Sequence, residues 1–199
     1  MKTQMRFQKI LMLVSLVVAA LTFVFALFFL TGSLGYATKY VTDAADPINA
    51  RAFVDASQGY VKTLVALGIV FIVIVAFMFI TSCQSRRNYY ITNYIAIGLF
   101  VAFALVMTVY IIIMVSKSMN LFLNDINWDA VPDRVAALGG LYPMDKGEKY
   151  PFIIGYVVAV LVLVDAALVV LSTVWKTLLM KGEKKLLEGS KNVQAEEVA

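Results

Sequence analysis

Four long stretches without charge constrain this chain more than any other feature. No charged residue occurs from Ile10 to Thr38, from Thr63 to Ser85 or from Asn88 to Ser116, and Asp165 is the only charge between Tyr150 and Trp175. Each stretch exceeds the roughly 20 apolar residues with which a helix crosses a bilayer core of about 30 Å. The sequence therefore predicts an integral membrane protein with four spans.

The composition indicates a single membrane domain. The chain is 61% hydrophobic and only 15% charged, whereas soluble domains carry about 25% charged residues. We expect residues 1–180 to form this domain and residues 181–199 to form a charged tail. The spans are predicted at about 10–34, 61–83, 91–115 and 152–175. The first apolar run continues through Leu34, which is longer than the roughly 7–15 residues of a signal peptide, so we expect an uncleaved span.

The basic residues predict the orientation. The two tails and the connection between the second and third spans hold ten Lys or Arg and four acids, whereas the two remaining loops hold seven basic and eight acidic residues. Cytoplasmic segments carry the excess of Lys and Arg, so both termini are expected in the cytoplasm, with the protein in the plasma membrane. The formal charge of +4 comes from residues scattered at span ends, a pattern typical of topology rather than of nucleic-acid binding.

The connections predict an all-α, up-down-up-down bundle. The connection at 82–88 is short, so the second and third spans must be antiparallel neighbours. Asp46 and Pro47 suit the cap and first turn of a helix, which indicates that the second helix begins outside the membrane. The third helix is expected to continue beyond its span toward Asn124, where polar residues break the apolar run.

The loop between the third and fourth spans contains a helical pattern. Apolar residues at helical spacing form one stripe, followed by the Gly139–Gly140 pair: Trp128, Val131, Val135 and Leu138. We predict a short extracytoplasmic amphipathic helix. The stripe could lie at the outer interface, cap the bundle or contact a partner, and its four residues are the candidate contacts.

Asp165 is the candidate intramembrane polar site. It lies near the centre of the last span, where insertion of an Asp costs about 2.5–3.5 kcal/mol. The predicted spans contain no Arg or His, and their one Lys is Lys62 at the edge of the second span, so the protonated acid is favoured. Asp165 could tie helices together through a backbone carbonyl or through one of four hydroxyls: Ser15, Thr22, Thr108 or Tyr110. It could instead exchange a proton or cation during transport, or pair with the charge of a partner subunit.

Small residues mark the expected packing face of the last span. Gly155, Ala159, Ala166 and Thr173 lie within about 40° of one another at 100° per residue, and such stripes permit close helix approach. Asp165 lies at the flank of this stripe. Gly155, Ala159 and Ala166 are therefore the candidate helix-packing residues.

No motif predicts catalysis, a metal site or a cofactor. The chain has no histidine, no Gly-rich phosphate loop and a single cysteine, Cys83. We expect Cys83 to be a small apolar residue at a helix end, and acylation of its thiol is the alternative. We therefore expect a non-enzymatic structural or accessory subunit of a membrane assembly, bound to the bilayer and to a second copy or other membrane subunits. The alternative is a small proton- or cation-coupled transporter that uses Asp165.

Overall fold

The described part of the chain is entirely helical in its regular structure. The computed structural model describes residues 2–31, 33–41, 46, 48–83, 89–137, 139–140 and 144–197. These residues form the helices α1 (Lys2–Thr31), α2 (Ser33–Tyr40), α3 (Arg51–Cys83), α4 (Tyr89–Asn124), α5 (Val131–Ala137) and α6 (Tyr150–Glu197). Four of these helices, α1, α3, α4 and α6, contain segments long and apolar enough to cross a membrane. The prediction of four membrane-spanning helices is confirmed at this level.

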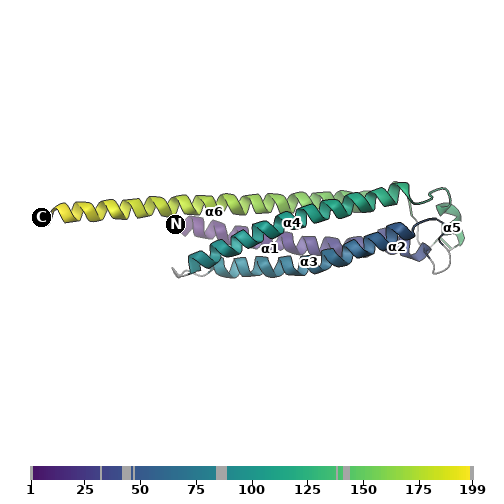
Figure 1. Cartoon of the computed structure of the whole chain (residues 1–199), viewed down its shortest axis with the longest axis horizontal. Coiled ribbons are helices and arrows are strands. Elements are labelled where there is room, and N and C mark those ends of the chain that lie inside the picture. Colours follow the sequence, from purple (N-terminus) through teal and green to yellow (C-terminus); the bar gives the residue numbers. More distant parts are fainter. Residues whose placement is uncertain are drawn as a thin grey trace.

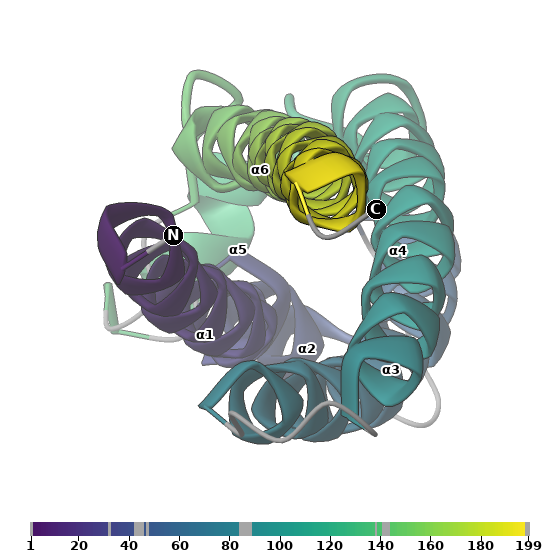
Figure 2. The same cartoon turned by 90° about the vertical axis from the view of Figure 1, so that its left-hand side faces the viewer.

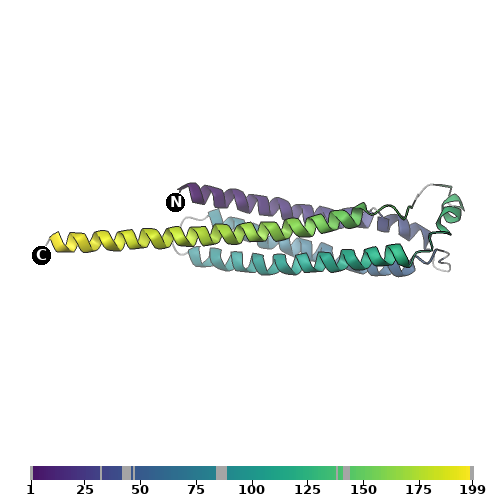
Figure 3. The ribbon, with the colours of Figure 1, turned by 90° about the horizontal axis from the view of Figure 1, so that it is seen from above.

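The four long helices form a closed bundle. They lie side by side with alternating direction, and the start of α1, the end of α3 and the start of α4 are at the same end (Figures 1 and 3). Helix α1 packs against α3 and α6, and α4 packs against the same two helices, so consecutive long helices are neighbours around the bundle (Figure 2). This is the predicted up-down-up-down arrangement.

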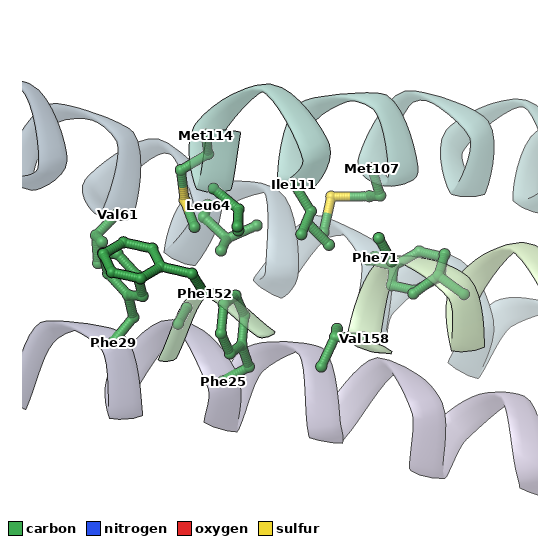
Figure 4. Packing of buried hydrophobic residues seen from close by; sticks show 14 of the residues in the cluster. Phe25, Phe29, Val61, Leu64, Phe71, Met107, Ile111, Met114, Phe152 and Val158 are labelled. Atoms are coloured by element: carbon green, nitrogen blue, oxygen red, sulfur yellow. The ribbon is translucent and has the colours of Figure 1, made fainter. Parts of the chain in front are cut away.

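Aromatic side chains pack among Ala, Val, Ile, Leu and Met in the interior of the bundle. Phe29 of α1 and Phe152 of α6 meet edge to face with ring centroids 5.7 Å apart, and Phe71 of α3 stacks on Phe100 of α4 at the same separation. Figure 4 shows Phe25, Phe29 and Phe152 close together between the helices. The outward faces are apolar as well, because in a membrane they contact lipid rather than water.

Two predicted boundaries can be compared with the structure: the end of the first span and the start of the charged tail. The first predicted span, 10–34, is divided between α1 and α2, and α2 continues through Tyr40 because Ala37 and Tyr40 are buried against the neighbouring helices. Helix α6 also passes position 181 without a break and continues to Glu197. The charged tail is thus a continuation of the last span's helix.

Asp46 stabilises the start of α3, as predicted, but the helix begins at Arg51, later than the predicted first turn. The two carboxylate oxygens of Asp46 accept hydrogen bonds from the backbone N–H groups of Ala50 and Arg51, at 2.8 and 2.9 Å. These groups have no carbonyl partner within the helix, so the carboxylate stabilises the first turn. Pro47, the other half of the predicted signal, lies outside the described residues.

Helix α5 lies at the end of the bundle opposite the chain termini (Figure 1). Val131 is buried, and Trp128 Nε1 donates to the backbone carbonyl of Phe122 at 3.1 Å. Asn127 N–H also donates to the carbonyl of Ile48 at 2.8 Å, which joins the two loops at this end. Val135 is half-buried, and Leu138 lies outside the described residues. The side of the membrane on which α5 lies remains a prediction.

Candidate functional site

Asp165 faces the interior of the bundle and contacts α1. Its side chain is 3% exposed, and Oδ1 lies 2.9 Å from Ser15 Oγ. Of the four hydroxyls named as possible partners, only Ser15 makes this contact in the described structure. Thr22 and Thr108 donate to carbonyls of their own helices, and Tyr110 donates to a carbonyl of α3. The second carboxyl oxygen, Oδ2, is buried without a hydrogen-bond partner among the described residues.

The surroundings of Ser15 fit a protonated Asp165. Ser15 Oγ lies 2.9 Å from the carboxyl and 3.1 Å from the backbone carbonyl of Leu11. A hydroxyl has one proton to donate, but it can accept as well. Two full hydrogen bonds form together if the carboxyl donates to Ser15 Oγ and Ser15 donates to Leu11. The geometry therefore accommodates a neutral acid as a tie between α1 and α6.

A second polar cluster joins all four long helices. Asn93 of α4 is its centre: Oδ1 accepts from Gln8 Nε2 of α1 at 3.2 Å and from Lys176 Nζ of α6 at 3.1 Å. The amide nitrogen of Asn93 donates to Ser82 Oγ at 2.9 Å and to Thr81 Oγ1 at 3.3 Å, both on α3. One side chain thus links the bundle at the end that carries the termini.

Lys176 belongs to the bundle interior, which the sequence analysis did not predict. It was assigned to the basic segment after the last span, but its side chain is only 8% exposed. Its ammonium group donates to Asn93 and lies 5.6 Å above the centre of the Tyr94 ring, within reach of a cation–π interaction. The interior position is possible because α6 continues past Trp175 and because Asn93 supplies an acceptor.

The two clusters lie along one interior face of α6. Asp165, Ser172 and Lys176 are all buried, and at 100° per residue they lie within about 40° of one another. Ser172 Oγ is the second atom of this face that is buried without a hydrogen-bond partner among the described residues. We call the following set the buried polar column: Gln8, Ser15, Asn93, Asp165, Ser172 and Lys176. A seven-residue spacing separates Gln8 from Ser15 and Asp165 from Ser172. This repeat is the feature of the sequence from which the buried polar column could have been predicted.

The small residues of α6 lie at buried helix contacts. Ala159 and Ala166 are 1% and 3% exposed. A Cβ atom built at Gly155 would lie 2.8 Å from Phe25 Cζ of α1 and would also overlap a methyl group of Val115 of α4. Any larger residue at this position forces the side chains of Phe25 and Val115, or α6 itself, to shift.

Neither a metal site in the described residues nor a comparison with known proteins indicates a function for this chain. Among the described residues, the His, Cys, Asp and Glu side chains form no group of three that could hold a metal ion, and Cys83 is exposed at the end of α3. No family model matches this chain, and no match was found among curated proteins or solved structures. The geometry of the bundle is therefore the basis for the proposed function.

Proposed function

We propose that this chain is a non-enzymatic integral membrane protein that acts as a structural or accessory subunit of a membrane assembly. The projection of α6 beyond the bundle carries this proposal. With 48 residues, α6 is about 72 Å long at 1.5 Å per residue, more than twice the bilayer core. Its C-terminal part continues well past the N-terminus of α1 (Figure 1). Helices in proteins are stabilised mainly by packing against other elements, so the projection is the expected contact for another subunit or a second copy.

The proposed orientation places this projection in the cytoplasm. The start of α1, the end of α3 and the start of α4 lie at the same end of the bundle as the projection of α6 (Figure 1). The segments that begin or end there hold the ten basic residues counted above, of which Lys176 is buried. The positive-inside rule supports a cytoplasmic position for this end. Helix α5 would then face the outside of the plasma membrane.

Truncation after Gly182 tests the proposed role of α6. The parent chain is expected to purify in mild detergent as an oligomer or with other subunits, whereas the truncated chain is expected to keep the parent's thermal stability and lose the assembly. Size-exclusion chromatography with light scattering measures both states. A matched control replaces residues 183–199 with a Gly/Ser segment of equal length and should behave like the truncation. A parent chain that is a monodisperse monomer without co-purifying protein would contradict the proposal.

A proton- or cation-coupled transporter is the second candidate. The buried carboxyl of Asp165, with one oxygen lacking a hydrogen-bond partner among the described residues, favours it. Intramembrane carboxylates of this kind serve as proton or cation sites in transporters. Substrate-dependent proton flux into vesicles that contain the purified protein would support this function over the first.

Substitutions at Asp165 separate the two candidates. For a structural residue, Asp165→Asn should stay within about 0.5 kcal/mol of the parent, because the amide can still donate to Ser15 Oγ. Asp165→Leu should lose a tie worth about 0.6–2 kcal/mol. Thermal stability and assembly state in detergent measure these effects. Ser15→Ala, added to the Asp165→Asn and Asp165→Leu variants, isolates the contribution of Ser15 to stability. For a transport residue, both variants fold normally and both lose flux. An Asn variant that assembles normally but abolishes a cellular phenotype would contradict the structural role.

A further inference from the structure

Two side-chain oxygens in the terminal half of the bundle lack hydrogen-bond partners among the residues that the structure describes. Asp165 Oδ2 and Ser172 Oγ are both buried, and both belong to the interior face of α6. Buried polar groups in proteins are normally paired with protein atoms or with water. Two unpaired oxygens on one face, two helical turns apart, therefore indicate an occupant that lies between them.

We propose that water molecules bind in the buried polar column between Asp165 and Lys176 and enter from the end that carries the termini. The Cα atoms of Asp165 and Ser172 are separated by about 10.5 Å along the helix. One bridging water spans two hydrogen bonds of about 3 Å, so a chain of at least two waters fits this separation. Buried waters typically make about three hydrogen bonds to polar groups that otherwise lack partners. Asp165 Oδ2 and Ser172 Oγ supply such partners.

The open end of the column is the Asn93 cluster. Lys176 follows Ser172 by one helical turn, about 6 Å, and Gln8 lies one seven-residue repeat from Ser15 on α1. Gln8 and Lys176 both contact Asn93, where the four helices present amide, hydroxyl and ammonium groups. Polar groups therefore occur at the levels of Asp165, Ser172 and Lys176, with the buried Val169 between the first two.

The other half of the bundle closes the column. Beyond Asp165, the interior face of α6 continues with Val162, Val158 and Phe152, which are at most 7% exposed. Phe25 and Phe29 of α1 pack beside Val158 and Phe152 (Figure 4). The buried hydroxyls of Thr22 and Thr108 in this half already donate to carbonyls of their own helices. The water chain therefore does not continue there, and Asp165 has aqueous contact with one face of the membrane only.

Silver ions test this one-sided access. In a Cys83→Ser background, Ser172→Cys changes a single side-chain atom and places a thiol in the column. The protein is kept in sealed vesicles, Ag⁺ is added to one face, and the remaining free thiol is counted after denaturation by its reaction with a polymer-linked maleimide. The parent's exposed Cys83, at the same end of the bundle as the termini, reports which face that end occupies in each vesicle preparation.

The expected result is rapid protection of Ser172→Cys from the face at which Cys83 reacts. Val162→Cys is the matched control, because it is equally buried on the same face of α6 but beyond Asp165. Protection of Ser172→Cys should be at least about tenfold faster, a factor equivalent to 1.4 kcal/mol. Leu171→Cys, which is 65% exposed and directed outward, should resemble Val162→Cys. Equal rates at positions 172 and 162, or protection from the opposite face only, would overturn the proposal.

Discussion

Asn93→Leu is expected to destabilise the bundle by about 3 kcal/mol. The substitution removes the oxygen that accepts from both Lys176 and Gln8, and it removes the amide group that donates to α3. Lys176 is buried, so its ammonium group loses an acceptor in the interior of the bundle. Thermal or denaturant unfolding of the purified protein in mild detergent measures the loss.

Two controls assign this effect to the buried cluster. Asn93→Asp keeps acceptor oxygens for Lys176 and Gln8 and should therefore lose much less stability. Asn120→Leu changes an exposed Asn of the same helix and should stay within about 0.5 kcal/mol of the parent. In the Asn93→Leu background, Lys176→Met removes the buried charge and should recover part of the loss. Equal destabilisation by Asn93→Leu and Asn120→Leu would show that the cluster contributes nothing to stability.

The four spans could be predicted because their signal is local. A stretch without charge and longer than about 20 residues has few alternatives to a membrane helix. The stabilising role of Asp46 and the extension of α4 to Asn124 could also be predicted, because each depends on a few adjacent residues. Helix α2 was missed because its helical structure depends on the burial of Ala37 and Tyr40 against other helices.

The inward faces of the helices were much harder to predict. Ile95 is 64% exposed and Ile97 only 5%, although the two residues are identical and belong to the same span. In a soluble protein, hydrophobicity separates the inside from the outside, but here lipid and core are both apolar. Polar and small residues therefore indicate which face of each helix points into the bundle. Asn93 was missed because Gln8 and Lys176 reach it from 85 and 83 positions away in the sequence.

Gly155→Leu should destabilise the bundle by about 3 kcal/mol, and Gly155→Ala by somewhat less. Even a single added carbon meets Phe25 and Val115 at distances that real Cβ atoms do not show, so these side chains or α6 itself must shift. The interior is packed too densely to absorb the added volume without such a shift. Unfolding in mild detergent measures the loss, and the variant should also shift the emission of Trp175, which packs against Phe7 of α1.

Gly98 provides the matched control for Gly155. It lies within the helix α4, and a Cβ atom there meets nothing within 4 Å. Gly98→Ala should therefore be neutral or should stabilise the bundle by up to about 1 kcal/mol, because alanine favours helix more than glycine does. Val115→Ala combined with Gly155→Ala makes room for the new methyl group and should be less destabilised than the sum of the two single variants. If Gly155→Ala and Gly98→Ala behave alike, the close approach of α6 to α1 and α4 is wrong, since only that approach distinguishes the two glycines.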